Sequence, residues 1–296
     1  MFSSYQVCAV PVRSDTPDVH TVVHLGHGIH VQDHAGDNPP VVLLPGFPDN
    51  LRLYDRLVPH LESRHVLAVD FLGWGASDKP AGYPRTAHDQ TAELAAVLDA
   101  LSPAAPVVLV AHDASGPPAV DYALLHPARV AALVLLNTYY AASRTLRAPE
   151  AVILYSTPGL RRVARAVARR VPRVDRALFT WQIGRFVRDA SARATLVPAL
   201  YRDFVAARPA FWRLTADLPS TLRDRRRRVP DLARLPVPVR VVFGARDPYL
   251  GPRVARELAG WFGVEPVLVP DAGHYVQVDA PAAVAHQILG SPIHRP

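Results

Sequence analysis

The chain has 296 residues, of which 49% are hydrophobic and 20% are charged, and its formal net charge is +7. This length is enough to bury a large core in one domain, or in one domain that carries an insertion. The sequence has no apolar run of membrane-spanning length, and its start, MFSSYQVCAV, lacks the basic and apolar regions of a signal peptide. We therefore expect a soluble, cytoplasmic protein. Its single cysteine, Cys8, excludes an internal disulfide and fits a reducing compartment.

The basic residues are almost all arginines, because Lys79 is the only lysine among the 33 basic residues. Abundant arginine, alanine and proline with almost no lysine is typical of the coding bias of a GC-rich genome. We therefore discount the basicity as a functional signal, and we expect neither a nucleic-acid partner nor a membrane partner. The sequence leaves a homodimer open.

The first predicted element is an antiparallel hairpin at a sheet edge, formed by residues 19–25 and 29–34 around a turn at residues 26–28. Short apolar runs follow at residues 41–44, 66–69, 107–110, 130–136, 239–243 and 267–269. Helical patterns lie between the runs, for example at residues 91–101, 254–262 and 282–289. This alternation, with strands that are apolar on both faces, predicts an α/β protein with a parallel sheet and helices on both faces.

The alternation stops between Thr138 and about Leu232, where the sequence is helical, rich in arginine and without clear strands. We expect an inserted helical cap at residues 138–232 and a core at residues 1–137 and 233–296. In residues 160–171, three valines lie on one helix face and five arginines lie largely on the others. This pattern favours a solvated basic face over a membrane or nucleic-acid contact. The arginines at 225–228 are predicted to form a solvated linker that returns to the core.

Polar turns follow several predicted strands, and the carboxyl ends of parallel strands are where an open sheet forms its active site. The candidate residues in these turns are, in chain order, His112, Asp113, Ser115, Asp247 and His274. A candidate nucleophile, an acid and a histidine therefore occur in the order of an α/β-hydrolase triad.

Asp113 is a better candidate nucleophile than Ser115. A nucleophile elbow needs small residues two positions before and after its nucleophile, because helix and strand cross closely there. Asp113 has Ala111 and Ser115 at those positions. Ser115 would be flanked by Asp113 and Pro117, which fits badly. A simpler role for Asp113 as a helix N-cap does not explain the matching acid and histidine.

The chain resembles the α/β-hydrolase family over nearly its whole length. Residues 70–80, DFLGWGASDKP, are similar to the D-x-x-G-x-G-x-S-x-x-P loop of that family. Gly273-His274, followed by Gln277 and Pro281, resembles the histidine loop of the family. The resemblance implies an α/β-hydrolase fold, with a mostly parallel eight-stranded sheet, helices on both faces and an inserted helical cap.

Within that family, His112-Asp113 is similar to the H-D elbow of epoxide hydrolases and their dehalogenase relatives. The resemblance implies that Asp113 attacks the substrate, that His274 activates water as a general base, and that Asp247 orients the imidazole.

The oxyanion hole is the second part of the resemblance. Residues 45–48, PGFP, resemble the H-G-x-P motif of the same group, with Pro45 in place of the histidine. The resemblance implies that the backbone N–H groups of Phe47 and Ala114 stabilise the oxyanion.

A carboxylate nucleophile limits the reactions that the site can catalyse. Its attack on an ester carbonyl would give a mixed anhydride, which is a poor intermediate. Its attack on a saturated carbon gives an ordinary ester that water can hydrolyse. An aspartate elbow therefore favours epoxide opening or carbon–halogen cleavage over ester or peptide hydrolysis.

The residues beside Asp113 favour an epoxide over a halide. Haloalkane dehalogenases typically place N–H donors where this chain has Ala114 and Phe47. Fluoroacetate dehalogenases place arginines just after the nucleophile, and residues 114–119 contain none. We expect a hydrolase that opens an apolar epoxide to a vicinal diol through an ester on Asp113, without cofactor or metal. A haloalkane or haloacid dehalogenase and a non-hydrolytic ligand-binding relative remain the alternatives.

Epoxide hydrolases present two cap tyrosines to the ring oxygen. Tyr201-Arg202-Asp203 resembles the segment that carries the second one, so the resemblance implies that Tyr201 is an acid. The candidates for the first are Tyr155, Tyr139 and Tyr140. The side chains expected to contact the substrate are Tyr155, Trp181, Trp212 and His112.

The N-terminal hairpin carries five histidines: His20, His24, His27, His30 and His34. Metal sites need convergent ligands with supporting hydrogen bonds. Histidines across an edge hairpin mostly point to solvent, so we expect no metal site there.

Overall fold

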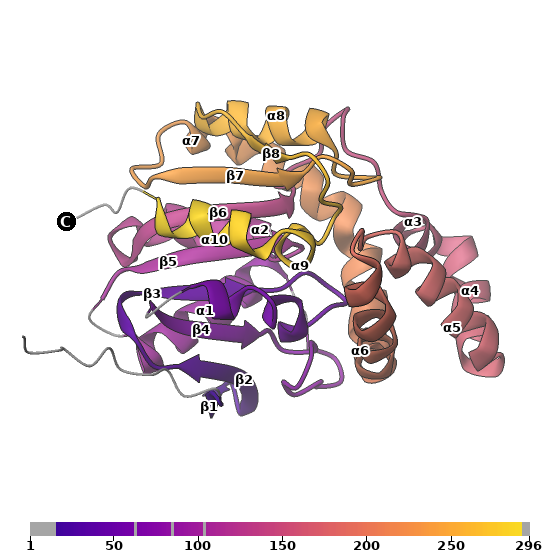
Figure 1. Cartoon of the computed structure of the whole chain (residues 1–296). Helices are drawn as coiled ribbons and strands as arrows, with labels where there is room; N and C mark the ends of the chain where they lie inside the picture. Colours follow the sequence, from indigo (N-terminus) through magenta and orange to yellow (C-terminus); the bar gives the residue numbers. More distant parts are fainter. Residues whose placement is uncertain (1–15, 62–63, 84–85, 103–104, 292–296) are drawn as a thin grey trace, which may run out of the picture.

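The computed structural model describes residues 16–61, 64–83, 86–102 and 105–291. The expectations for Cys8 and for the first ten residues fall outside this part of the chain. Eight strands form one sheet in the order β1-β2-β4-β3-β5-β6-β7-β8 (Figure 1). The pairs β1–β2 and β2–β4 are antiparallel, and all other neighbours are parallel. The predicted α/β architecture, with a mostly parallel sheet, is confirmed.

The strands are β1 (Asp18–His24), β2 (His27–His34), β3 (Asp37–Leu44), β4 (Arg64–Asp70), β5 (Val107–Asp113), β6 (Val130–Thr138), β7 (Val239–Gly244) and β8 (Val267–Val269). The helices are α1 (Ala87–Leu101), α2 (Gly116–Leu125), α3 (Glu150–Ser156), α4 (Pro158–Arg170), α5 (Pro172–Gly184), α6 (Ala190–Arg225), α7 (Val229–Leu232), α8 (Pro252–Phe262), α9 (Val276–Asp279) and α10 (Pro281–Leu289). Short 3₁₀ turns are η1 (Leu51–Tyr54), η2 (Val58–His60), η3 (Pro127–Arg129) and η4 (Arg226–Arg228). Within the described residues, no helix has both the length and the apolar character needed to cross a membrane.

The N-terminal hairpin is present, with a tighter turn than the sequence predicts. Leu25 and Gly26 both have a positive φ, 50° and 78°, and they close a two-residue turn between β1 and β2. Two-residue turns with positive φ match the twist of the flanking strands. His27 and Gly28 therefore belong to β2 and not to the turn.

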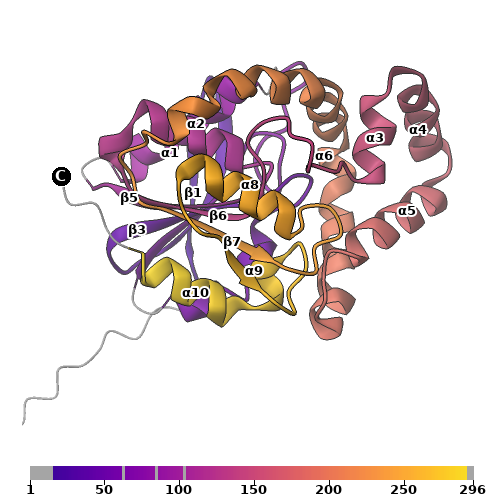
Figure 2. The same ribbon diagram turned by 90° about the horizontal axis from the view of Figure 1, so that it is seen from above.

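Two apolar layers cover the sheet, because successive strand residues point to opposite faces. In β3, Val42 and Leu44 pack with α1, α2 and α8, whereas Val41 and Leu43 pack with η1 and α10. Figure 2 shows α1 and α2 on one side of the sheet and α10 on the other. The predicted cover of helices on both faces is thus confirmed, and both faces of the central strands are buried.

The chain between β6 and β7, residues 139–238, is described throughout and contains helices but no strand. We use the name cap for residues 138–232, the division that the sequence predicts. The helices α3 to α6 of the cap lie together beside one end of the sheet (Figure 1).

The return from the cap to the core is not a solvated linker, so that prediction is wrong for Arg225. Its buried guanidinium donates to Asp121 Oδ2 from Nε (3.1 Å) and from Nη2 (3.0 Å). Arg228 Nη1 and the Tyr140 hydroxyl donate to Asp121 Oδ1, at 2.9 and 2.8 Å. A buried carboxylate requires such partners, and this cluster joins the end of α6 to α2 in the core.

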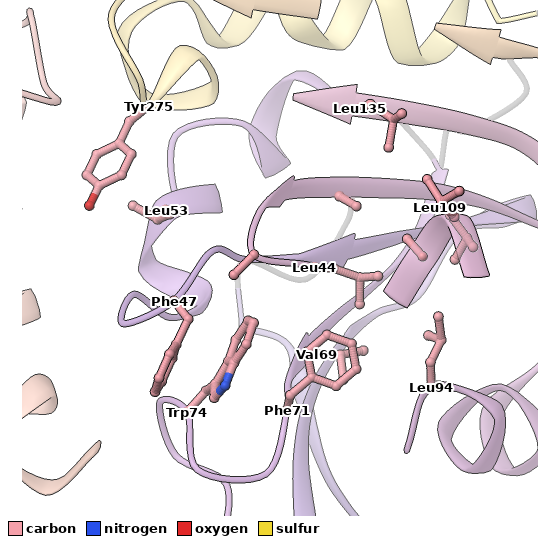
Figure 3. Close-up of a cluster of buried hydrophobic side chains, with 14 of the residues drawn as sticks. Leu44, Phe47, Leu53, Val69, Phe71, Trp74, Leu94, Leu109, Leu135 and Tyr275 are labelled. Carbon is pink, nitrogen blue, oxygen red and sulfur yellow. The ribbon is translucent and has the colours of Figure 1, made fainter. Parts of the chain in front are cut away.

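The loop after β4 packs against Phe47 of the PGFP motif. Asp70 accepts hydrogen bonds from the backbone N–H groups of Leu51 (3.2 Å) and Ala76 (2.9 Å). This fold of the loop places Trp74 against Phe47, with stacked rings whose centroids are 4.8 Å apart (Figure 3). The loop that resembles the family motif therefore acts through packing behind Phe47.

Candidate active site

Asp113 lies at a sharp turn where β5 ends and α2 is about to begin. Its φ is 47°, a left-handed conformation that is rare for residues other than glycine. The turn is crowded. A Cβ added at Gly46 would lie 2.7 Å from Asp113 Cβ, and one added at Gly116 would collide with the Thr138 hydroxyl. Glycines at positions 46 and 116 therefore leave room for the strained turn, which places the Asp113 carboxylate at the carboxyl end of β5.

Two backbone N–H groups, those of Ala114 and Phe47, hydrogen-bond the Asp113 carboxylate. Burial raises the pKa of Asp113, and the positive charge of His274 together with these N–H groups opposes that rise. The sequence-predicted oxyanion donors thus converge on the carboxylate of the candidate nucleophile.

His274 and Asp247 form a buried pair next to Asp113. His274 Nδ1 donates to Asp247 Oδ2 at 2.7 Å, and Asp247 Oδ1 accepts from the backbone N–H groups of Tyr249 (2.8 Å) and Leu250 (3.0 Å). Burial opposes charge on the imidazole, but Asp247, Asp113 and Asp49 outweigh it and raise the pKa of His274 to about 9. The structure thus brings the three predicted triad residues together, with the pKa of His274 raised above its ordinary value.

Ser115, the alternative nucleophile, lies behind the turn. Its hydroxyl donates to the backbone oxygens of Leu44 (2.7 Å) and His112 (2.8 Å) and accepts from the backbone N–H of His112 (3.0 Å). It is fully buried and does not line the cavity described next. The hydroxyl joins β3, β5 and α2, which is a structural role.

A cavity of about 350 Å³ opens above Asp113, between the core and the cap. Asp113 and His274 lie in its wall together with Phe47, Ala114 and Tyr139. Most of the remaining lining is aliphatic or aromatic and comes from α3, α5 and α6: Ala151, Val152, Leu154, Tyr155, Leu178, Phe179, Trp181, Ile183, Phe204, Phe211, Leu214 and Leu218. Such a cavity suits an apolar small molecule.

The candidate cap phenols lie in different places. Tyr139, directly after β6, lines the cavity, and burial together with the Asp113 charge raises its pKa. Tyr155 also lines the cavity, with its ring against Phe211 and Trp212. The Tyr140 hydroxyl bonds Asp121 instead.

The structure does not bring Tyr201 to the cavity. Its hydroxyl donates to Asp175 Oδ2 (3.1 Å) and approaches the backbone oxygen of Pro172 (3.4 Å). Arg208 contacts the same Asp175 oxygen, so Tyr201 belongs to a polar contact between α5 and α6. Tyr201 is absent from the cavity lining.

The other predicted substrate contacts are also spread out. Trp181 lines the cavity and is half exposed. Trp212 lies behind Tyr155, under the guanidinium groups of Arg165 and Arg169, and does not line the cavity.

His112 is fully buried and contacts the backbone of His274. Its Nε2 lies 3.1 Å from the backbone oxygen of His274, and its Nδ1 has no hydrogen-bond partner among the described residues. Burial, and then the charge of His274, lower the pKa of His112. A neutral His112 therefore supports the histidine loop and does not reach the cavity wall.

Two buried residues near the triad escaped the sequence reasoning. Asn137 donates to Asp247 Oδ2 from Nδ2 and accepts from the Gly244 N–H, both at 2.8 Å. Asp49 accepts from the Tyr275 hydroxyl at 2.7 Å, and burial raises the pKa of Asp49 to about 7. Asp49 directly follows the PGFP motif, so its position was a signal that could have identified it.

The histidine-rich hairpin does not assemble a metal centre. His20 Nε2 and His65 Nε2 lie 3.2 and 2.8 Å from the two carboxylate oxygens of Asp33. Across the described residues, no group of three or more His, Cys, Asp or Glu side chains could hold a metal ion.

Comparison with known proteins shows the family to which the chain belongs. Residues 39–281 match the family model of the alpha/beta hydrolase fold. A putative hydrolase, LipZ, from Mycobacterium tuberculosis is 30% identical over 277 residues, which cover 88% of this chain and 91% of the relative. Haloalkane dehalogenase 2 from the same organism is 27% identical over 275 residues, 88% of this chain and 90% of the relative.

Two further similarities are more limited. A cis-3-alkyl-4-alkyloxetan-2-one decarboxylase from Shewanella oneidensis is 36% identical over 122 residues, and the match spans 40% of this chain and 38% of the relative. The crystal structure of an epoxide hydrolase from Vigna radiata superposes with a TM-score of 0.74 at 18% identity, over 93% of this chain and 97% of that one. At that identity the superposition is a likeness of fold.

Proposed function

Because this chain belongs to the α/β-hydrolase fold family, we propose that it opens apolar epoxides to vicinal diols through a covalent ester on Asp113. One observation carries the proposal. The carboxylate at the strained turn faces an apolar cavity, next to an imidazole that a second carboxylate orients. An apolar cavity of about 350 Å³ favours bulky substrates, and the small side chain of Ala114 beside the nucleophile leaves room for them.

The first half-reaction is attack at saturated carbon. The Asp113 carboxylate bonds to a ring carbon, the carbon–oxygen bond of the epoxide breaks, and the ring oxygen becomes an alkoxide that takes a proton from a phenol. We assign Tyr139 as that phenol, because it lies in the same cavity wall and because burial, and then the Asp113 charge, raise its pKa and keep the phenol in its proton-carrying form. The His274 imidazolium then returns a proton to the phenolate.

The second half-reaction uses the charge change at Asp113. Once Asp113 is an ester, its negative charge no longer raises the pKa of His274, so the imidazole loses its proton more readily and stays in the neutral form that a general base requires. His274 takes a proton from water, and hydroxide attacks the ester carbonyl. The N–H groups of Phe47 and Ala114 stabilise the oxyanion. Collapse releases the diol, which carries away the proton of the regenerated Asp113 carboxyl, and His274 is protonated as at the start.

Carbon–halogen hydrolysis is the second candidate, and the similarity to haloalkane dehalogenase 2 favours it. A leaving halide needs N–H donors, and the indole of Trp181 is one in the cavity lining. However, Trp181 lies on α5 and is half exposed. Apart from His274, which the proposed mechanism uses as the base, the side chains that share the inner wall with Asp113 are those of Phe47, Ala114 and Tyr139, and they offer a phenol and no N–H group.

The deciding experiment is intact-protein mass spectrometry of His274→Ala after incubation with a panel of epoxides and haloalkanes. Without the base, the ester should accumulate, so we expect a mass gain equal to a whole epoxide, on the peptide that contains Asp113. The double variant Asp113→Asn/His274→Ala is the matched control and should stay unmodified. A gain equal to a haloalkane minus hydrogen halide would replace the proposal with the dehalogenase reaction. Inactivity of the wild type on the whole panel would favour the ligand-binding alternative.

A further inference from the structure

The outermost layer of the cap is formed by two neighbouring helices, α4 and α5. In Figures 1 and 2 they lie farthest from the sheet, on the outer side of α6. We call residues 158–188, which comprise α4, α5 and the segment that follows, the outer cap. For residues 160–171 the sequence predicts a solvated basic face in preference to a membrane contact. That prediction takes no account of the large apolar side chains that the structure exposes on α4 and α5.

The outer cap exposes large apolar side chains in helical stripes. On α5, Val174, Leu178 and Trp181 follow one another at i, i+4 and i+7, and 44%, 52% and 51% of their surfaces are exposed. On α4, Leu160 and Val163 are 48% and 64% exposed. Single exposed apolar residues are ordinary on a protein surface, but rows of them on adjacent helices mark an interaction surface.

The outer cap also carries the whole positive excess of the chain. It has nine arginines, at positions 161, 162, 165, 169, 170, 173, 176, 185 and 188, and a single acid, Asp175. Nine of the 33 basic and one of the 26 acidic residues leave 24 basic against 25 acidic in the rest of the chain. Asp175 is buried and bonded to Arg208, so it does not offset the surface charge. A uniform coding bias would not place the excess in one segment.

Most of these arginines are available to a partner. In the described chain, the ion pair of Arg185 with Glu150, at 3.3 Å and largely exposed, is the one that links an outer-cap arginine to an acid. Arg169 and Arg176 rest on the rings of Trp212 and Tyr201. Guanidinium groups of this kind bind phosphate well.

We propose that the outer cap docks on membrane surfaces rich in anionic lipids. Such a surface accepts both features at once, because arginines bind the headgroup phosphates while apolar stripes enter the boundary with the acyl chains. A second copy of this chain fits less well, because a symmetric contact would press two strongly positive faces together. Nucleic acid also fits less well, because it would place Val163, Val174 and Leu178 against its charged phosphate backbone.

Docking would also bring the part of the cavity lined by Leu178 and Trp181 next to the lipid surface. Leu178 and Trp181 belong to the exposed stripe of α5 and also line the cavity that contains Asp113. An apolar substrate dissolved in the bilayer could then enter without crossing water. This delivery step rests on the proposed function, whereas the docking surface does not.

The test is sedimentation of the full chain with phosphatidylcholine vesicles, with and without phosphatidylglycerol. We expect binding to the vesicles that contain phosphatidylglycerol, weakened by salt, and little binding to phosphatidylcholine alone. Each basic residue near an anionic surface strengthens binding by about fivefold, so the triple variant Arg162→Glu/Arg170→Glu/Arg173→Glu should lose on the order of 100-fold.

A matched control reverses three exposed core arginines, in Arg234→Glu/Arg253→Glu/Arg256→Glu, which changes the net charge equally. We expect it to lose much less vesicle binding than the outer-cap variant. The pair Val163→Ser/Val174→Ser tests the apolar part and should weaken binding without changing the charge or the cavity lining. Circular dichroism shows whether each variant is folded.

Three results would overturn the docking proposal: no binding of the wild type to vesicles that contain phosphatidylglycerol, equal losses in the two charge variants, or binding to duplex DNA in place of vesicles. None of these readouts involves a substrate. Failure of the docking proposal is therefore distinct from failure of the proposed reaction.

Discussion

Two tyrosines that the sequence suggests as acids differ in what their hydroxyls contact. Tyr139 lies in the cavity wall with Asp113, whereas Tyr201 is bonded to Asp175 between two cap helices. Local sequence carries the resemblance that points to Tyr201. It does not reveal which face of α6 packs against α5, because that depends on contacts far apart in the chain.

The tyrosines give a direct test of the proposed first half-reaction. We expect Tyr139→Phe to slow formation of the Asp113 ester about 100-fold, within the range of general acid catalysis, because no phenol would protonate the alkoxide. Tyr201→Phe should leave this rate within about twofold. Rapid-mixing mass spectrometry of both variants, made in the His274→Ala background, measures the rate. A large loss in Tyr201→Phe with none in Tyr139→Phe would reverse the assignment.

Asp113, Asp247 and His274 could be identified from sequence because each lies at the end of an apolar strand or in the turn after it. The strand fixes where its carboxyl end lies, and neighbouring parallel strands end at the same edge of the sheet. Asn137 follows the same logic at the end of β6. Its role was missed because its amide acts on Asp247 rather than on a substrate, and residue type alone does not show this.

Among the elements, α2 and the end of α6 are joined by a buried charge cluster. Asp121 on α2 holds Arg225 through two hydrogen bonds and also binds Arg228 and Tyr140. Removing one partner of such a cluster leaves the other charge buried without compensation. The cluster therefore fixes the cap against the helix that begins just after Asp113.

We expect Asp121→Ala to lower the free energy of unfolding by about 3 kcal/mol or more. Asp99→Ala is the matched control, because it removes an exposed carboxylate that pairs with Arg129 on the surface. Asp99→Ala should lower the free energy of unfolding by less than about 1 kcal/mol. Urea unfolding of the two variants measures both values, and equal losses would contradict a special role for the cluster.

The strands were easier to predict than the cap. The central strands are short apolar runs, and burial on both faces leaves a strong pattern in the sequence. The cap lacks that regularity. Its longest helix, α6, continues through Pro198, Pro209 and Pro219, residues that usually indicate a helix end. The arginine run at 225–228 looked solvated because its partner, Asp121, is distant in sequence.

For the molecule as a whole, the buried charges of the site link stability to pH. The pKa of His274 is about 9, against an ordinary value of 6.5, and the pKa of Asp49 is about 7, against 3.8. Both raised values mean that the folded state binds more protons than the unfolded state over this range, so stability falls as pH rises. The His274 contribution is complete below pH 6.5 and is lost as the pH passes 9.

We therefore expect the free energy of unfolding to fall between about pH 6.5 and 9, with the His274 part on the order of 3 kcal/mol. Chemical denaturation of wild type and His274→Ala at several pH values isolates that part, because surface charges are common to both. The difference between the two proteins should shrink steadily over this interval. A difference that stays constant or grows with pH would show that His274 is not protonated in the folded protein.

The hydroxyl of Ser115 has a consequence for how such a protein is found. It lies two residues after Asp113, yet backbone oxygens of β3 and β5 engage it, and it has no exposed surface. Fluorophosphonate reagents label hydrolases by phosphonylating a reactive serine, and a carboxylate does not form a stable adduct with them. On the mechanism that we propose, chemical surveys of serine hydrolases would pass over this chain despite its shared fold, whereas electrophiles that alkylate carboxylates would report it.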